Sequence, residues 1–320
     1  MKVLITGAAG FIGFSLCNYL CKFNYDIYGI DNFDDYYDIK IKRQRINFLK
    51  TNYKKFKFAK IDIVNFKKLN FYVKKNKINY IINLAAQAGV RYSIQNPKKY
   101  IQTNINVFFN ILETSRINKI KRLIYASSSS VYGDNKIFPL KEKFILRPKN
   151  IYGLSKKNNE EMAQIYFNFY GLKSIGLRFF TVYGEWGRPD MLIMKYMNAY
   201  KNKKTFYINN YGKHDRDFTY IGDVIKFVKK VLDIQSKLPN TEIMNICSNR
   251  PINILKIIEL MKKNKINPIE KKISFQRADV LKTHGDNSKI KKFTKIKRYL
   301  DWKIGVQNTI NWWKLHYKIK

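Results

Sequence analysis

A glycine-rich turn stands between an apolar strand and a helix at the start of the chain. Lys2–Thr6 is a short apolar run typical of a buried strand, and Gly7, Gly10 and Gly13 follow it directly. A helical pattern comes next, and then a second predicted strand that ends at Asp31. Glycines let the backbone turn tightly and approach a pyrophosphate at the amino terminus of the helix, where free N–H groups favour anions. This order predicts a dinucleotide-binding site.

The acidic residue at the end of the second predicted strand bears on the choice of cofactor. A carboxylate there accepts hydrogen bonds from the ribose hydroxyls of adenosine, and it would repel the 2′-phosphate of NADP. Asp31 occupies this place, so we expect NAD as the cofactor. Asp62 and Ile63 follow the next predicted strand, where we expect them to contact the edge of the adenine.

Short apolar runs continue to alternate with helical patterns. Strands are predicted at 56–61, 80–86 and 122–127, and a long helix at about 97–115. Strands that alternate with helices build a parallel sheet with helices on both faces. The sequence therefore predicts an α/β fold with a doubly wound parallel sheet of the Rossmann type.

The charge of the chain suggests a nucleic-acid partner at first sight. The 320 residues include 62 Lys and Arg against 23 Asp and Glu, a net charge of +39. Proteins that bind nucleic acid concentrate such an excess on one face or tail. Here the lysines are spread over the whole length, as A/T-rich codons would produce. We therefore expect no nucleic-acid partner, although a positive field would attract an anionic small substrate.

Cysteine usage and apolar segments bear on the compartment. Three cysteines form no disulfide framework, and no stretch reaches the ~18 apolar residues of a membrane span. The first residues lead directly into the glycine motif and not into a secretory segment. We expect a cytoplasmic protein without membrane insertion. The three histidines have no metal-ligand spacing, so no metal site is expected.

A tyrosine and a lysine four residues apart open a later helical segment. Tyr152 and Lys156 share one face of that helix. A nearby ammonium group favours the phenolate form of a tyrosine and so lowers its pKa. The predicted strand at 122–127 leads into a run of four serines, whose hydroxyl groups can relay a proton and position a substrate oxygen. Together these residues predict acid–base chemistry beside the dinucleotide.

With these motifs the chain resembles the extended short-chain dehydrogenase/reductase family over essentially its whole length. Among members of that family it is most similar to the UDP-glucuronate 4-epimerases. The segments that carry the resemblance are 29–32 with 35–38, 85–93 and 177–191.

The resemblance implies roles for individual residues. Ser128, Tyr152 and Lys156 would be the catalytic trio, with Ser130 as an alternative for the hydroxyl because four serines stand in a row. Besides Tyr152 and Lys156, the residues expected to bind the cofactor are Gly7, Gly10, Phe11, Ile12, Gly13, Asp31, Asn32, Asp62, Ile63, Leu84, Ala85, Ala86 and Phe179. Those expected to bind the substrate are Arg91, Ser129, Ser130, Thr181, Arg188, Arg216 and Asp279.

Residues that the chain lacks narrow the reaction. Dehydratases of the family carry an Asp-Glu pair after the catalytic threonine, and the related decarboxylases carry a glutamate just before Val-Tyr-Gly. Ser129 and Ser130 stand in these places here. Without a carboxylate, elimination lacks its general acid and base. Epimerisation at one carbon of the sugar, through a 4-keto intermediate, is the reaction that remains.

A uronate substrate would need a grip on its carboxylate, because the 4-keto intermediate is a β-keto acid that can lose carbon dioxide. A bidentate cation with a hydroxyl donor meets this need. Arg188 with Thr181 is the first candidate, and Arg91 is the second.

The second half of the chain resembles the part of the family that binds the nucleotide sugar. Arg216 matches an arginine that holds the UDP phosphates, and Asp279 matches a residue of a uridine- and phosphate-binding motif. The usual Pro-Gly before that aspartate is Arg277-Ala278 here, so Arg277 is a further cation that could meet an anionic substrate.

The resemblance also implies the domain organisation and the assembly. It assigns an NAD-binding domain to 1–180, with a return segment near 217–235, and a smaller C-terminal α/β domain that binds the UDP-sugar to 181–320. It implies a homodimer formed through a four-helix bundle, with helices near 97–115 and 151–170 as the candidate faces.

The expected reaction is the 4-epimerisation of UDP-glucuronate to UDP-galacturonate for capsule or envelope polysaccharide synthesis. Two alternatives stay open. One is a 4-epimerase of UDP-glucose or UDP-N-acetylglucosamine. The other is a non-enzymatic protein of the same fold that senses NAD or binds nucleic acid.

Overall fold

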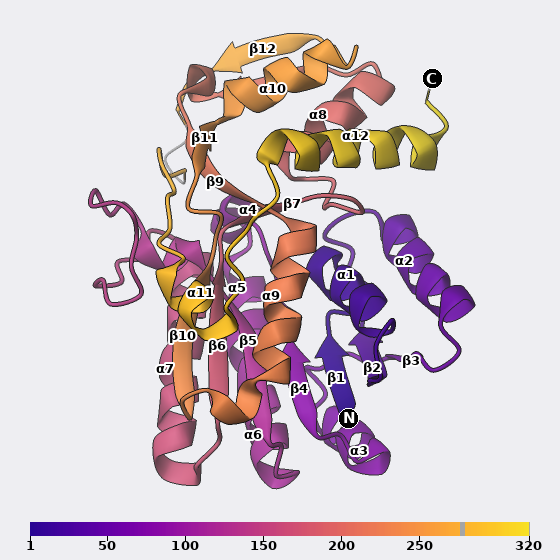
Figure 1. Ribbon diagram of the computed structural model, residues 1–320, viewed down its shortest axis with the longest axis vertical. Helices are drawn as coiled ribbons and strands as arrows, with labels where there is room; N and C mark the ends of the chain where they lie inside the picture. The colour runs from indigo at the N-terminus through magenta and orange to yellow at the C-terminus, as the bar shows by residue number, and fades with distance from the viewer. Residues whose placement is uncertain (276–278, 320) are drawn as a thin grey trace.

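Seven parallel strands form the central sheet in the computed structural model, which describes residues 1–275 and 279–319 (Figure 1). Across the sheet the strands are β10 (Thr241–Ile246), β6 (Ser174–Phe179), β5 (Arg122–Ser128), β4 (Tyr80–Asn83), β1 (Lys2–Thr6), β2 (Asp26–Asp31) and β3 (Lys57–Lys60). The predicted Rossmann-type fold is confirmed. The strand order reverses between β1 and β4, and such a reversal opens a crevice at the carboxyl ends of the strands.

Strand β1 shows why helices cover both faces of the sheet. Val3 and Ile5 pack into one apolar core, and Leu4 between them packs into another. A strand buried on both faces is apolar at nearly every position, as this one is. The helices over the first core are α1 (Phe11–Leu20), α2 (Ile39–Asn52), α9 (Ile221–Asp233) and α11 (Ser288–Thr294), and those over the second are α3 (Phe66–Asn76), α6 (Val107–Ile117) and α7 (Ile151–Tyr170).

The helix predicted at 97–115 is a series of shorter helical pieces. After α4 (Val90–Gln95) come α5 (Pro97–Tyr100) and a π-helix, η1 (Ile101–Asn106), which continues into α6. Within η1 the Asn104 side chain accepts a hydrogen bond from the Gln87 amide at 2.8 Å and donates to the Gln87 carbonyl at 3.0 Å. These bonds tie η1 to the loop after β4. The apolar pattern that predicts the helix carries no signal of these side-chain hydrogen bonds, so it does not predict the π-helix.

A second group of elements surrounds its own core at the other end of the molecule (Figure 1). Its two small sheets are β11 (Pro251–Asn253), β9 (Asp215–Tyr220) and β7 (Thr181–Tyr183), and β12 (Glu270–Ile273) with β8 (Phe206–Asn209). Its helices are α8 (Leu192–Lys201), α10 (Ile254–Lys263) and α12 (Trp302–Tyr317). Helix α9 returns to the large sheet inside the predicted return segment, whereas β10 joins that sheet from beyond it. The domain boundary at residue 180 stays a prediction.

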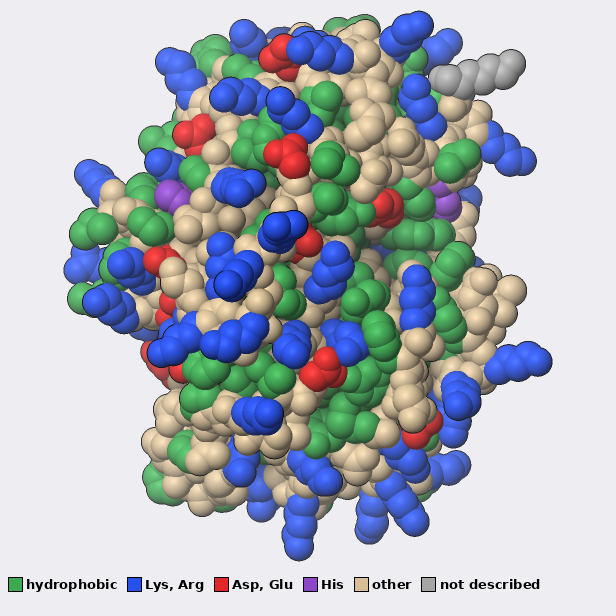
Figure 2. Space-filling model, in the orientation of Figure 1, with side chains coloured by type: hydrophobic (Ala, Val, Ile, Leu, Met, Phe, Trp, Pro, Cys, Tyr) green, Lys and Arg blue, Asp and Glu red, His purple; other side chains and the backbone are tan. Residues whose placement is uncertain are grey.

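Basic side chains are spread over the visible face of the molecule and do not gather in one patch. Figure 2 shows Lys and Arg side chains scattered over that face among few Asp and Glu. Within residues 1–275 and 279–319, no helix combines the length and the apolar character that crossing a membrane requires.

A buried ion pair fastens α7 to the sheet. The Arg178 guanidinium on β6 donates to both carboxylate oxygens of Glu160 on α7, at 2.9 and 2.7 Å. The two side chains are only 4% and 8% exposed. At the end of β5 the Ser127 hydroxyl donates to the same carboxylate, and the Tyr132 hydroxyl accepts from Arg178. The pair therefore fixes the position of α7 against strands β5 and β6.

Replacing Arg178 with Met would leave the Glu160 carboxylate buried without its partner. We expect the Arg178→Met variant to lose about 3–5 kcal/mol of unfolding free energy, measured by urea denaturation. Arg116→Met is the matched control, because Arg116 forms a similar two-bonded pair with Glu113 at the surface. That control should lose less than about 1 kcal/mol. Equal losses in the two variants would contradict this account.

Candidate active site

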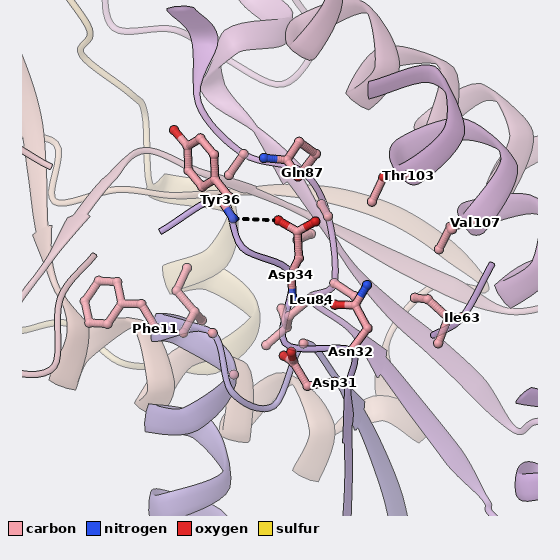
Figure 3. A pocket seen from close by; sticks show the side chains of 18 of the residues that line it. Phe11, Asp31, Asn32, Asp34, Tyr36, Ile63, Leu84, Gln87, Thr103 and Val107 are labelled. Carbon is pink, nitrogen blue, oxygen red and sulfur yellow. Dashed lines mark hydrogen bonds between the residues drawn. The ribbon is translucent and has the colours of Figure 1, made fainter. Parts of the chain in front are cut away.

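A cavity of about 610 Å³ lies at the carboxyl ends of the central strands. Every residue expected to bind the cofactor lines this cavity, and so does Ser128. In Figure 3, Phe11 stands at one side and Ile63 and Val107 at the other, with Asp31 and Asn32 between them. Residues from distant parts of the chain thus meet where the strand order reverses, as the parallel sheet requires.

The glycine turn has no room for a side chain at Gly7 or Gly13. Gly7 has a φ of +69°, in the left-handed region, and a Cβ on Gly13 would lie 2.1 Å from the Gly7 carbonyl oxygen. Helix α1 begins after Gly10, which brings no side chain to cap the first-turn amides. These amides have no acceptor within the helix, and they lie at the positive end of its dipole. The turn therefore fits the pyrophosphate of a dinucleotide.

Asp31 organises the cavity as well as facing it. One carboxylate oxygen accepts from the Ala9 amide in the glycine turn at 3.0 Å, and the other accepts from the Phe33 amide at 2.8 Å. Burial raises the pKa of Asp31. The next residue, Asn32, donates to Asp62 at 3.2 Å and so connects the loops after β2 and β3. The sequence indicated a ribose contact for Asp31, but not this second role in holding the glycine turn.

The catalytic trio predicted from the sequence meets at one wall of the cavity. Tyr152 lies in the first turn of α7, which Asn150 caps by accepting from the Gly153 amide at 2.8 Å. One turn further along, Lys156 donates from Nζ to the Ala126 carbonyl at 2.8 Å. Ser128 ends β5 and faces the Tyr152 phenol.

The four serines form two pairs that lie in different parts of the structure. Ser127 and Ser128 line the cavity. Ser129 and Ser130 begin the short 3-10 helix η2 (Ser129–Tyr132), in which the Ser130 amide donates to the Ser128 hydroxyl oxygen at 3.1 Å. The geometry thus favours Ser128 over Ser130 for the hydroxyl role, and the substrate contacts expected of Ser129 and Ser130 stay predictions.

Burial has the largest effect on the pKa values of Tyr152 and Lys156. It raises the pKa of the Tyr152 phenol, and the Ser128 hydroxyl and the positive charge of Arg188 act in the opposite direction. Burial also lowers the pKa of Lys156 from 10.5 to about 8, against the effect of Glu160. The sequence indicated Lys156 as the cation that favours phenolate, whereas in the structure the positive charge that lowers the pKa of Tyr152 is that of Arg188.

The residues expected to bind the substrate divide into two groups. Arg188 lines the large cavity, and together with Thr181 it lines a small adjoining pocket. Its Nε and one Nη donate to the two carboxylate oxygens of Asp190, the first at 3.0 Å. The sequence predicts that Arg188 grips a uronate carboxylate with two hydrogen bonds, but the edge of the guanidinium that carries Nε is already used within the chain.

The second group lies near β9. Arg91 pairs with Asp279 through two hydrogen bonds, of 3.2 and 2.6 Å. Arg216 donates to the carbonyls of Asp215 and Leu281, both at 3.0 Å, and burial lowers the pKa of Arg216 to about 10. Arg277 lies outside the described residues. Over the described part of the chain, no group of His, Cys, Asp and Glu could hold a metal ion.

One residue of this region has a role that the sequence does not predict. Arg45 on α2 is fully buried, and its guanidinium donates to the Ala9 carbonyl at 2.9 Å and the Tyr37 hydroxyl at 2.8 Å. It also donates to the carbonyls of Trp186 and Gly187, which directly precede Arg188. Arg45 thus joins the glycine turn to the loop that carries Arg188. A single arginine on a basic helix gives no signal of this role in the sequence.

The low pKa of Lys156 has a measurable consequence for stability. The unfolded chain keeps the lysine proton up to pH 10.5, whereas the folded protein loses it above about pH 8, so between these values the unfolded state binds more protons. We expect the unfolding free energy of the wild type, relative to that of Lys156→Met, to rise over this interval by on the order of 3 kcal/mol. Urea titrations at several pH values measure the difference, and a constant or falling difference would contradict it.

Known proteins resemble this chain over nearly its whole length. The model of the NAD dependent epimerase/dehydratase family matches residues 3–247. The UDP-glucuronate 4-epimerase of Thermodesulfobacterium geofontis is 36% identical over 97% of this chain and 95% of its own length, and Protein CapI of Staphylococcus aureus is 37% identical over 99% and 100%.

A solved structure extends the likeness to the whole fold. The UDP-glucuronic acid 4-epimerase of Bacillus cereus, solved with UDP-glucuronic acid and NAD, superposes with a TM-score of 0.93 at 30% identity and covers 99% of this chain and 100% of its own. The predicted enzyme class and the predicted cofactor, NAD, are confirmed, and the non-enzymatic alternative falls away. The chain belongs to the NAD dependent epimerase/dehydratase family.

Proposed function

We propose that the chain is a UDP-sugar 4-epimerase whose preferred substrate is UDP-glucuronate, which it converts to UDP-galacturonate. The observation that carries this proposal is the position of Arg188, a cation in the wall of the same cavity as the reactive phenol of Tyr152. A uronate brings its carboxylate close to the carbon that reacts, so a cation beside the phenol suits it. The relatives from T. geofontis and B. cereus, both named for this substrate, support the choice.

The chemistry requires proton transfer at the sugar 4-hydroxyl. Tyr152 removes that proton as phenolate and later returns it, while Ser128 holds the same oxygen. NAD, which the glycine turn and Asp31 would hold, would supply the hydride transfer at C4 in both directions. Lys156 and Arg188 place positive charge near the phenol, which favours the phenolate at the moment it is needed.

A neutral sugar is the second candidate, and one observation favours it. Asp190 already pairs with Arg188, so this arginine has a partner within the chain and needs no substrate carboxylate to balance its charge. UDP-glucose and UDP-N-acetylglucosamine need no such cation. The two candidates differ in what Arg188 is for, so they can be separated by experiment.

Turnover of UDP-glucuronate and UDP-glucose by the purified protein tests the proposal. We expect a higher kcat/KM with UDP-glucuronate, a loss of this preference in Arg188→Ala, and a loss of about 10²–10⁴ in kcat in Tyr152→Phe, which keeps the ring and removes the proton carrier. A higher kcat/KM with UDP-glucose would favour the neutral-sugar epimerase. Absence of turnover with every UDP-sugar would overturn both.

The assembly proposed with this function is a homodimer through α6 and α7. Phe109 on α6 and Phe169 on α7 are 48% and 78% exposed. The Phe109 ring contacts Tyr166, and the Phe169 ring contacts Tyr170, so the exposed rings continue into one aromatic patch across both helices. Exposed apolar patches of this kind mark interfaces, and a second copy of the same two helices would complete a four-helix bundle.

The double variant Phe109→Asp/Phe169→Asp should elute as a monomer in size-exclusion chromatography, because charges in the patch would oppose its burial. Leu315→Asp is the matched control, since Leu315 on α12 is 81% exposed but lies outside the patch. A wild type that is itself monomeric, or a double variant that stays dimeric, would contradict the assembly.

We further propose that the protein works in the cytoplasm, in capsule or envelope polysaccharide synthesis.

A further inference from the structure

The tyrosine-rich segment after β2 reaches from the cofactor end of the cavity to Arg188. It includes Tyr36, whose hydroxyl donates to Asp190 at 3.1 Å. Asp190 in turn accepts two hydrogen bonds from Arg188. A chain of polar contacts thus runs from Tyr36 through Asp190 to Arg188, and both Tyr36 and Arg188 line the cavity. The resemblance to known epimerases pointed to this segment without assigning it a role.

Tyr36 is held firmly enough to act as an anchor. Its amide donates to the Asp34 carboxylate at 2.9 Å, which Figure 3 marks, and Asp34 forms an ion pair with Lys99 at 2.9 Å. Its ring packs against Tyr92 with ring centroids 5.0 Å apart. A Cβ on Gly89 would approach the Tyr36 hydroxyl to 2.3 Å, so a residue without a side chain makes room for that hydroxyl.

The protonation states suit the contacts. Burial, with the charge of Asp190, raises the pKa of Tyr36 to about 12, so its hydroxyl remains a donor at neutral pH. Burial works against the ionisation of Asp190, but Arg188 prevails and lowers the pKa of that carboxyl. A neutral donor and a cation therefore share one carboxylate. The Arg188 guanidinium also lies over the Tyr36 ring, 5.7 Å from its centroid.

Asp190 occupies only part of Arg188. Nε and one Nη donate to the Asp190 carboxylate, so the other Nη lies outside that pair. The guanidinium faces the cavity and is close enough to Tyr152 for its charge to affect the phenol. A guanidinium fixed at one edge can present its remaining donors in one direction only, which is what selection of a planar carboxylate needs.

We propose that Tyr36 and Asp190 are positioning residues that orient the guanidinium of Arg188 toward the carboxylate of a uronate, and that they thereby determine the preference for a uronate over a neutral sugar. This inference rests on the proposed function. Neither Tyr36 nor Asp190 is among the residues expected to bind the substrate or to transfer a proton.

Kinetics with UDP-glucuronate and UDP-glucose test the proposal on the full-length protein. Tyr36→Phe removes one hydroxyl and keeps the ring; we expect kcat/KM for UDP-glucuronate to fall roughly tenfold, as the loss of one hydrogen bond to a charged group predicts, with UDP-glucose changed less than about twofold. Asp190→Asn should reduce the ratio of the two kcat/KM values by more than Tyr36→Phe, because it removes the anchoring charge. Both effects should lie mainly in KM.

Tyr92→Phe is the matched control. Tyr92 belongs to the same aromatic cluster, but its hydroxyl forms no hydrogen bond with residues 1–275 or 279–319, and we expect the ratio to stay at the wild-type value. Thermal unfolding of each variant separates a local change from a general loss of structure.

The outcomes distinguish the positioning role of Tyr36 and Asp190 from the proposed function. A uronate preference that persists in Tyr36→Phe and Asp190→Asn, or that declines equally for both sugars, overturns the positioning role and leaves the proposed function intact. A wild type that prefers UDP-glucose, or that turns over neither sugar, overturns the proposed function and this inference with it. A preference lost in Arg188→Ala and reduced in both positioning variants supports the inference.

Discussion

The buried pair of Arg178 and Glu160 determines where α7 lies, and the reactive side chains depend on α7. Glu160 is one turn beyond Lys156, and Lys156 is one turn beyond Tyr152, so a single helix face carries the anchor and both reactive groups. Separating Arg178 from Glu160 would leave a charge buried without a partner, which strongly disfavours alternative packings of α7. The same carboxylate receives the Ser127 hydroxyl, immediately before Ser128. The pair therefore aligns the helix and the serine strand with one another.

Much of this arrangement can be predicted from the sequence because it depends on local patterns. The strand–glycine–helix order requires a turn without side chains, and the close approach of Gly13 to Gly7 shows the physical reason. Alternating strands and helices imply a parallel sheet, and a parallel sheet brings the residues after its strands to one edge. The whole expected set of cofactor residues lies in one cavity for that reason.

The rest depends on contacts between segments far apart in the sequence. Neither the link from Arg45 to the Trp186 carbonyl nor the link from Tyr36 to Asp190 has a periodicity or spacing to reveal it. The same holds for the π-helix, which reflects hydrogen bonds of Asn104 to a loop. The net charge of +39, which dominates the composition, contributes little to these contacts. A few partly or fully buried cations organise the site, and composition cannot separate them from the many exposed ones.

The buried guanidinium of Arg45 connects the glycine turn to the loop that carries Arg188. Its contacts are backbone carbonyls and a phenol, in the glycine turn on one side and in the loop before Arg188 on the other. Any shift of one loop must stretch or exchange bonds that also hold the other. On the proposed function, a cofactor in the glycine turn and a sugar at Arg188 would therefore act on a common element. Thermodynamic reciprocity would then require each of them to change the affinity for the other by the same factor.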